Sequence, residues 1–350
     1  MNHTIKAEQR ARRFFRRPPA SFPTLTGRCS TIQEASNQAL FFQTAKGRRN
    51  RISRTGIVKA IAYMMERRSV TRKEMEKFSR FSSALLALLR LIFIDIIRIR
   101  ITKTGLIRLS LKGTRFVFSG VDRAPRDMRV ARENGAEVVM MSYYHLREDH
   151  SERWKYHVKE NGLKVLLDSG AFSLWEAAAK GRIVKPILLE EYISFVKRHL
   201  DVLIGYFNLD VIGDLYASRA NMQAMEAAGL SPHEVWHVCS PLEELNRIVD
   251  KGAALVGIGG SALLKDGERL PRIDEALRRH PEQDFHLLGV GSKILFQLDG
   301  VFSTDATNWI EGRKSGRLLT PDGQKPMGHL LDGLEIMARN VRLLVGMAAQ

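Results

Sequence analysis

Six short polar or glycine-containing segments each follow an apolar run in the last two thirds of the chain. Three contain an aspartate, and the others supply a histidine or paired glycines. These segments are Asp168-Ser169-Gly170, Asp210, His237, Gly259-Gly260, Gly289-Val290-Gly291 and Asp305. An aspartate after a strand is commonly only a helix N-cap, but six such segments together indicate a pocket. Three carboxylates and permissive glycines suit a flat polar ligand, whereas one histidine supplies no metal-ligand spacing.

From residue 116 onward, short apolar runs alternate with helical stretches. This alternation is typical of βα units and a parallel sheet. The expected strands are Phe116–Ser119, Glu137–Met141, Lys164–Leu167, Val202–Leu209, Val235–Val238, Leu255–Ile258, Phe285–Leu288 and Val301–Thr304. The expected helices include Asp127–Asn134, Leu188–His199, Leu215–Ala228, Pro241–Lys251, Pro271–Arg279 and a last one at about Met327–Met347. Eight strands predict an α/β fold, a TIM (β/α)8 barrel in preference to a doubly wound sheet, with the six segments at the end that carries barrel active sites.

Five motifs occur in the order seen in tRNA-guanine transglycosylases. They are Leu167-Asp168-Ser169-Gly170-Ala171-Phe172, Asn208-Leu209-Asp210, Gly257-Ile258-Gly259-Gly260, His286-Leu287-Leu288-Gly289-Val290-Gly291 and Thr304-Asp305-Ala306-Thr307. The resemblance spans about residues 116–317. Within this superfamily the chain most resembles the DNA-acting branch, the DpdA-type enzymes of bacteria and phages that place 7-deazaguanine bases in DNA.

The resemblance implies a role for each aspartate. Asp305 matches the nucleophile that attacks C1′ of the target nucleoside, expels guanine and forms a covalent glycosyl-enzyme. Asp168 matches the residue that manages protons as one base leaves and another enters. Asp210 matches an acid that recognises the N–H edge of a guanine-like ring.

The resemblance also implies a substrate-binding set around these acids. Gly259 and Gly260 match a segment whose backbone amides meet the purine O6, and Gly289 and Gly291 would keep the pocket wall thin. The rest of the expected set is Ser169, Gly170, Phe172 and His237. Phe172 and the Tyr143-Tyr144 pair are candidates for stacking on the base, with ordinary barrel packing as an equal alternative.

The chemistry of an N-glycosidic bond agrees with two carboxylates of different function. Cleavage develops oxocarbenium character at the sugar, so one carboxylate can stabilise and bond to C1′ while the other serves the base. Two successive displacements retain the anomeric configuration. Because C1′ is reached only when the target base has left the helix stack, base flipping or a single-stranded substrate is required.

Two departures from the tRNA enzymes and one alternative placement of the nucleophile matter. Those of bacteria carry a structural zinc site of three cysteines and a histidine near the C-terminus, whereas no cysteine follows Asp305 here. Ala171 stands where they usually have a second glycine. The neighbouring Asp299 is the alternative nucleophile if the eighth strand is displaced.

The positive charge of the chain is confined to its N-terminal third. Residues 1–115 hold 26 Lys and Arg against 6 Asp and Glu, whereas the remainder holds 29 against 32. Charge confined to one segment indicates a polyanion partner there. Residues 1–50 are Arg-rich, carry three prolines and are expected to be a largely disordered extension.

Residues 51–115 predict a small nucleic-acid-binding domain. Helices are expected at Ile57–Arg67, Thr71–Phe78 and Ser82–Phe93, followed by a hairpin of Ile96–Ile101 and Leu106–Leu111 around Gly105. Three helices and a hairpin resemble a winged helix, and a helical cap on the main domain is the alternative. The residues expected to meet phosphates are Arg72, Lys73, Lys77, Arg80, Arg98, Arg100, Lys103 and Arg108.

Composition limits the remaining possibilities. Cys29 and Cys239 are the only cysteines, which argues against a disulfide framework and a cysteine-based zinc site and favours a reducing, cytoplasmic setting. The most apolar run, 84–97, is interrupted by Arg90 and Asp95 and is too short to span a membrane.

We therefore expect a DNA-guanine transglycosylase that exchanges guanine for 7-cyano-7-deazaguanine or a relative. Neither ATP nor a redox cofactor is required, and partner proteins of a DNA-modification system are possible. The alternatives are exchange on tRNA and a non-catalytic DNA-binding sensor of deazapurines. The sensor is disfavoured because it has use for the recognition acid but not for the nucleophile.

Overall fold

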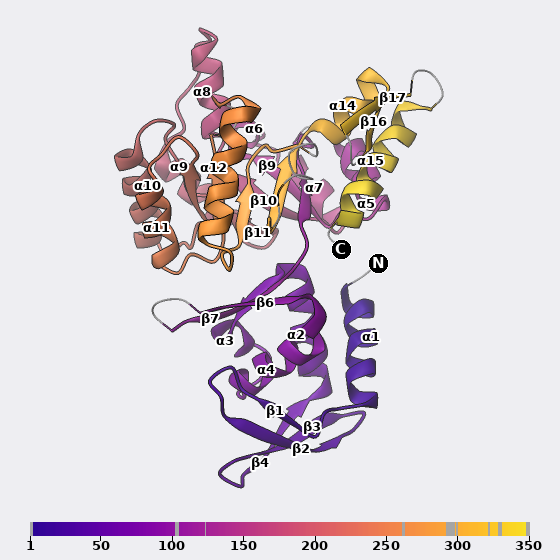
Figure 1. Ribbon diagram of the computed structural model, residues 1–350. Helices are drawn as coiled ribbons and strands as arrows, with labels where there is room; N and C mark the ends of the chain where they lie inside the picture. Colours follow the sequence, from indigo (N-terminus) through magenta and orange to yellow (C-terminus); the bar gives the residue numbers. More distant parts are fainter. Residues whose placement is uncertain are drawn as a thin grey trace. The chain divides into compact units, whose positions relative to one another are not determined.

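The computed structural model describes residues 3–101, 105–122, 124–260, 263–291, 298, 300–320, 323–327 and 331–347. The chain divides into two compact units, Met1–Lys112 and Gly113–Gln350 (Figure 1). The expected boundary at residues 115 and 116 therefore lies three residues too late. Among the described residues, no helix is both long and apolar enough to span a membrane.

The second half of the N-terminal unit follows the expected order of helices and strands. Its elements are α2 (Arg54–Arg67), β5 (Ser69–Thr71), α3 (Arg72–Met75), α4 (Ser82–Ile92), β6 (Ile97–Ile101) and β7 (Ile107–Leu111). The three strands form an antiparallel sheet in the order β5-β7-β6. A winged helix requires this order of elements: a helix, a strand, two helices and a hairpin. Of the expected turn at 102–105, residues 102–104 lie outside the described residues.

The expectation that residues 1–50 are disordered is wrong. They form α1 (His3–Arg16) and an antiparallel sheet of β1 (Ser21–Pro23), β2 (Cys29–Ala35), β3 (Ala39–Thr44) and, continuing to residue 53, β4 (Arg49–Ser53). The buried side chains of Phe22, Leu40, Phe42 and Ile52 share one hydrophobic core with α2 and α4. Their burial stabilises order in a segment whose arginines and prolines alone favour disorder.

Helix α4 is buried along most of its length. Residues 84–89 all lie in the core of the N-terminal unit, and only Ser83 of this helix is exposed. The N-terminal segment supplies part of the cover: the ring of Phe42 contacts Phe81, which precedes α4, and Arg10 Nη1 donates to the carbonyl of Ile92. In the winged-helix interpretation α4 would be the helix that enters the DNA major groove, but its surface is not available for that contact.

The C-terminal unit contains the eight expected parallel strands. They are β8 (Arg115–Phe118), β9 (Val138–Ser142), β10 (Lys164–Asp168), β11 (Leu203–Tyr206), β12 (Glu234–His237), β13 (Val256–Gly259), β14 (Phe285–Leu287) and β15 (Ser303–Ala306). Neighbouring strands pair in sequence order, with β15 beside β8. A parallel bridge between Phe207 and His233 joins the two remaining edges, so the sheet closes as a barrel.

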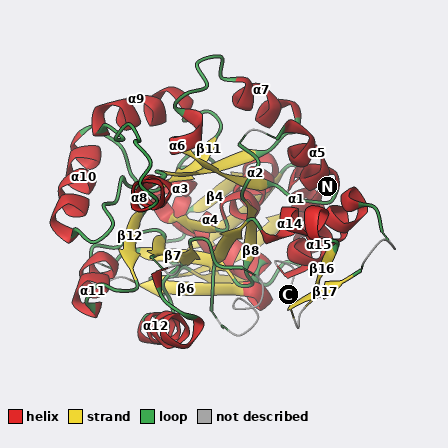
Figure 2. Cartoon of the chain, turned by 90° about the horizontal axis from the view of Figure 1, so that it is seen from above, coloured by secondary structure: helices red, strands yellow, loops and turns green. Residues whose placement is uncertain are grey.

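Helices surround the strands, as the expected βα alternation requires (Figure 2). They include α5 (Pro125–Glu133), α7 (Arg153–Glu160), α9 (Leu189–His199), α10 (Leu215–Ala227), α11 (Leu242–Asp250) and α12 (Asp266–Arg279). Pro271, expected to begin a helix, lies inside α12. The last helix, α15 (Gly333–Met347), begins six residues later than expected. In front of it, β16 (Arg317–Thr320) pairs antiparallel with β17 (Gly323–Pro326), a break that the sequence interpretation missed.

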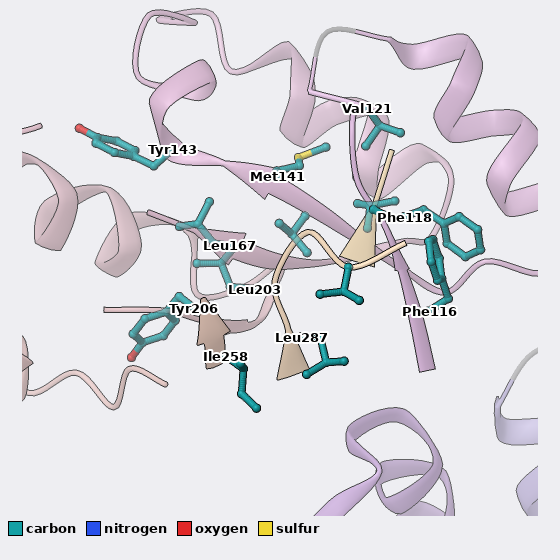
Figure 3. Close-up of a cluster of buried hydrophobic side chains, with 14 of the residues drawn as sticks. Phe116, Phe118, Val121, Met141, Tyr143, Leu167, Leu203, Tyr206, Ile258 and Leu287 are labelled. Carbon is teal, nitrogen blue, oxygen red and sulfur yellow. The ribbon is translucent and has the colours of Figure 1, made fainter. Parts of the chain in front are cut away.

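The strands bury apolar side chains on both faces. Phe116 and Phe118 belong to the cluster between strands and helices, part of which is shown in Figure 3, whereas Val117 between them belongs to a second cluster. Leu166 of β10 and Val235 of β12 also lie in the second cluster. Because side chains alternate along a strand, a residue two positions further points to the same face. This geometry carries Asp168 and His237 into the barrel interior above the apolar layer.

Candidate active site

The three sequence-predicted aspartates lie at the carboxyl-terminal ends of three strands. Asp168 is the last residue of β10, Asp210 follows β11 after three intervening residues, and Asp305 lies near the end of β15. Asp210 and Asp305 are close enough to act electrostatically on Asp168. In the part of the chain that the structure describes, none of the three pairs with a lysine or arginine, so their negative charges remain uncompensated by a neighbouring cation.

Asp168 is a carboxyl group that titrates near neutrality. It lies deep within the protein, although part of its surface still contacts solvent. Burial, followed by the charges of Asp210 and Asp305, raises the pKa of Asp168 to about 7, against the opposing effect of a hydrogen bond from Gly170 N to Asp168 Oδ2 (2.9 Å). A group that is half protonated at neutral pH can both donate and accept a proton during a reaction.

Asp305 is held through one of its two oxygens. Its Oδ1 accepts a hydrogen bond from Gly289 N at 2.9 Å and lies 3.3 Å from His286 Nε2. Its Oδ2 makes no hydrogen bond among the described residues. The Asp305 side chain is therefore oriented while one carboxylate oxygen stays available for attack on an electrophile.

His286 completes this arrangement and was not singled out as a site residue from the sequence. Its side chain is fully buried, with Nδ1 2.8 Å from Ser303 Oγ. If Nε2 carries the proton and donates to Asp305, then Nδ1 accepts from Ser303, and the ring stays neutral. The available signal was a histidine inside an expected strand, because a buried imidazole requires partners.

Asp210 forms a second network. Its Oδ1 accepts from Ser169 Oγ at 3.0 Å, and its Oδ2 lies 2.7 Å from His237 Nε2. The residues of this network are all buried. Ser169 and His237 are expected to bind the substrate, and in this structure both contact Asp210, the expected recognition acid, and so orient its carboxylate. Nδ1 of His237 makes no hydrogen bond among the described residues, so this atom remains available to a ligand.

Asp122 is a fourth carboxylate at this end of the barrel, and the sequence interpretation missed it. It lies four residues beyond the end of β8, accepts a hydrogen bond from Ser142 N at 2.8 Å through Oδ1, and contributes to the raised pKa of Asp168. Among the described residues, no group of three or more His, Cys, Asp or Glu side chains is arranged to hold a metal ion.

The predicted glycines keep the strand ends close together. A Cβ on Gly259 would lie 2.9 Å from Val235 Cγ1 and 3.1 Å from the His237 ring. Gly260 and Gly289 have positive φ, and a Cβ on Gly291 would lie 3.1 Å from the Asn308 side chain. Gly259 thus makes room for His237, and Gly289 turns its amide toward Asp305.

The aromatic candidates separate into packing residues and partly exposed ones. Tyr143, which is labelled in Figure 3, is buried, and its ring packs against Tyr192 and Phe195 at centroid distances of 5.1 and 5.0 Å. Of the two alternatives for Tyr143, stacking on a base and ordinary barrel packing, the structure shows packing, because the apolar core already holds its ring. Phe172 is partly exposed and stacks on Trp175 at 5.8 Å, so it remains a candidate.

Comparison with known proteins gives no family assignment. No model of a known protein family and no curated protein matches the sequence. Similar solved structures include a protein described as a fructose-1,6-biphosphate aldolase from Coccidioides immitis (14% identity, 68% of this chain and 90% of that one, TM-score 0.42). They also include tryptophan synthase from M. tuberculosis (10%, 67% and 94%, 0.41) and the tryptophan synthase alpha subunit of Legionella pneumophila (13%, 67% and 93%, 0.39). The chemistry of the site therefore rests on its side chains.

The expected phosphate-contacting residues fall into two groups. Arg72, Lys73, Lys77 and Arg80 are exposed on and after α3, and Arg98 is partly exposed. Arg100 and Arg108 are buried, which contradicts their expected role, because a buried guanidinium is not offered to a phosphate. They lie opposite each other on β6 and β7, where Arg108 Nη1 donates to Ser69 Oγ. Lys103 lies outside the described residues.

We expect Gly170→Ala to destabilise the protein by about 3 kcal/mol or more. Gly170 has φ +83°, and a Cβ there would overlap Tyr144 Cβ and lie 2.7 Å from Ser142 Oγ. The matched control is Gly181→Ala, where φ is +70° but the added Cβ meets no atom within 4 Å, at an expected cost of about 1 kcal/mol. Urea unfolding of both variants measures the difference; equal losses would show that close packing at Gly170 contributes nothing.

Proposed function

We propose that this protein is a base-exchanging transglycosylase that replaces guanine in DNA with a 7-deazaguanine base, 7-cyano-7-deazaguanine or a close relative. The observation that carries the proposal is the difference between two neighbouring carboxyl groups. Asp168 has its pKa raised to about 7, whereas Asp305 is oriented by a backbone amide and a buried histidine with one oxygen left available. Exchange at an N-glycosidic bond requires one group for protons and one for the sugar.

In the first displacement, Asp305 Oδ2 attacks C1′ of the target nucleotide. The C1′–N9 bond breaks, its electron pair leaves with guanine, and protonated Asp168 supplies the proton that the departing base takes up. The products are a glycosyl ester on Asp305, free guanine and ionised Asp168. Positive character at the sugar is stabilised by the carboxylates around it as it develops.

In the second displacement, the incoming 7-deazaguanine base loses its N9 proton to ionised Asp168. Its N9 then attacks C1′ and breaks the ester bond to Asp305, which restores both carboxyl groups to their starting states. Two inversions at C1′ leave the nucleotide with its original configuration. The exchange is balanced without ATP and without an oxidant or reductant.

Asp210 and His237 are proposed to select the base. The Asp210 carboxylate accepts from Ser169 and contacts His237 Nε2, which leaves His237 Nδ1 and the remaining lone pairs of Asp210 to face the hydrogen-bonding edge of a purine. The backbone amides of Gly259 and Gly260 would meet the purine O6, as the resemblance implies. Phe172 is the side chain proposed to stack on the ring.

DNA is proposed as the target because of two features of the sequence. No cysteine follows Asp305, although the bacterial tRNA enzymes that the barrel resembles carry a zinc site there. The positive charge is confined to the N-terminal unit, whereas residues 116–350 hold more acidic than basic side chains. Capture of the polyanion by the N-terminal unit fits this distribution.

The decisive experiment supplies the full chain with 7-cyano-7-deazaguanine and either duplex DNA, single-stranded DNA or tRNA, then digests the nucleic acid to nucleosides for mass spectrometry. A deazapurine deoxynucleoside is the expected product. Modified tRNA beside unmodified DNA would contradict the choice of DNA. Deazapurine binding without incorporation into any of the three would favour the sensor.

A further inference from the structure

The buried position of α4 changes where the N-terminal unit can meet nucleic acid. Residues 84–89 lie in the core, so the helix that would enter a major groove cannot present its side chains. Part of its cover is residues 1–50, which hold 10 Lys and Arg against 2 Asp and Glu. The segment that buries α4 therefore itself carries an excess of positive charge.

Two of these basic residues, Arg12 and Arg16, line a groove between α1 and the turn that joins β2 to β3. The groove has a volume of about 510 Å³ and is lined by arginines from two separate segments: Arg12 and Arg16 from α1, and Arg54 from the start of α2. Asn37 of the turn contributes a polar edge, and Phe15 an aromatic surface.

The arginine heads are held in different ways. Arg54 has only 15% of its side chain exposed, pairs with Glu8 at 2.7 Å and lies 5.2 Å from the centre of the Phe15 ring. Arg12 is 66% exposed, with its Nε 3.7 Å from the same Glu8, and Arg16 is exposed with no carboxylate partner among the described residues. Glu8 is thus the one carboxylate among the described residues that line the groove with three guanidinium groups.

Such an arrangement leaves an excess of positive charge in the groove. Like charges gathered in one groove repel each other, and Glu8 offsets only one of three. A basic helix face that is simply solvated does not need arginines from a second segment beside it, because its side chains can spread into solvent. Exposed guanidinium groups beside a fixed one suit successive phosphates of a nucleic-acid backbone, for which Arg is well matched in geometry.

We infer that the groove between α1 and the β2–β3 turn binds the phosphodiester backbone of DNA, without reading its sequence. The choice of DNA over another polyanion rests on the proposed function. The groove lies apart in sequence from the exposed cations of α3, and it supplies a contact that α4 cannot make. It would hold DNA by charge while base selection is left to the barrel.

The test measures binding of the full chain to a duplex of arbitrary sequence at several salt concentrations, with no incoming base present. Arg12→Gln with Arg16→Gln should weaken binding and make the plot of log K against log salt shallower by about two, because each arginine that neutralises a phosphate adds about one to the slope. The control is Arg272→Gln with Arg279→Gln, which removes the same charge from exposed positions of α12 and should leave the slope unchanged.

Two single variants guard against misfolding as an explanation. Asn37→Asp adds a negative charge at nearly constant shape and should weaken binding, whereas Glu8→Gln removes the opposing carboxylate and should tighten it. An unchanged slope in the arginine variant, equal losses in the α12 control, or loss of binding to anionic phosphatidylserine vesicles but not to DNA would overturn the inference. The readout is DNA binding, so it is independent of the assay of base exchange. If the salt slope changes as expected but no exchange is detected, the proposed reaction is refuted and the inference about the groove stands.

Discussion

Replacing Asp305 with asparagine should reduce base exchange by about four orders of magnitude or more, because the reaction loses its nucleophile. The substitution is close to isosteric. The asparagine Oδ1 can still accept from Gly289 N and His286, so the geometry of this strand end is retained. The rate of deazapurine incorporation into DNA measures the loss, and a thermal melt checks that the variant is folded.

Asp299→Asn is the matched control for this prediction. Asp299 was the alternative nucleophile in the sequence, and it lies outside the described residues. Its variant should retain exchange and, without an incoming base, form a protein–DNA adduct that survives a denaturing gel; Asp305→Asn should form none. The opposite pattern, with activity lost at 299 and kept at 305, would assign the nucleophile to Asp299.

The barrel was predictable because each strand is visible in the sequence as an apolar run and its end as a following polar residue or glycine. Short, largely apolar runs such as Lys164–Leu167 and Phe285–Leu288 are followed by aspartate or glycine, and they contain adjacent apolar residues rather than a strict alternation because both faces of such strands are buried. The helix boundaries were less well marked: Pro271 falls inside α12 because tertiary packing of a long amphipathic helix can outweigh one lost hydrogen bond.

The N-terminal unit shows what local reasoning missed. In Ala39–Thr44 the short apolar run with two phenylalanines is a strand signal, and Ala39, Leu40 and Phe42 are buried, but the surrounding arginines and prolines obscured it. The strands are also stabilised by pairing with each other and by a core shared with α2 and α4, which composition does not reveal. Helix α4 carried a readable sign, since a helix that is apolar nearly all round is a buried one.

The candidate site was only partly predictable for a related reason. Strand ends locate Asp168, Asp210 and Asp305, because carboxyl ends of parallel strands share one edge. Their partners depend on which side chains meet across strands. His286 reaches Asp305 from the neighbouring strand, and His237 reaches Asp210 across the barrel closure, so these contacts follow from register and not from spacing along the chain.

Replacing Asp168 with asparagine should separate its role in catalysis from its effect on stability. Exchange should fall by about 100-fold to 10 000-fold, because asparagine cannot pass a proton to the leaving base or take one from the incoming base. In the wild type, the rate should rise with protonation of Asp168 for the first displacement and with its ionisation for the second. The pH profile of exchange should therefore peak near the pKa of about 7 and lose this peak in the variant.

The same variant should be more stable than the wild type above neutral pH. The pKa of Asp168 is higher in the folded protein than its ordinary value near 4, so the folded state holds this proton more strongly than the unfolded chain does. Wild-type stability should therefore fall as pH rises from about 4 to about 7 and stay lower above that. Asparagine carries no charge to repel Asp210 and Asp305, and it can still accept from Gly170 N, so at pH 8 the free energy of unfolding should rise by about 2 kcal/mol.

Urea unfolding of the wild type and the variant at pH 4 and pH 8 measures this difference. The control is Asp214→Asn, at an exposed helix N-cap, which should show no such gain. If the variant is less stable than the wild type at pH 8, the carboxylates do not destabilise the folded protein by repelling one another. That result would contradict a pKa of about 7 for Asp168.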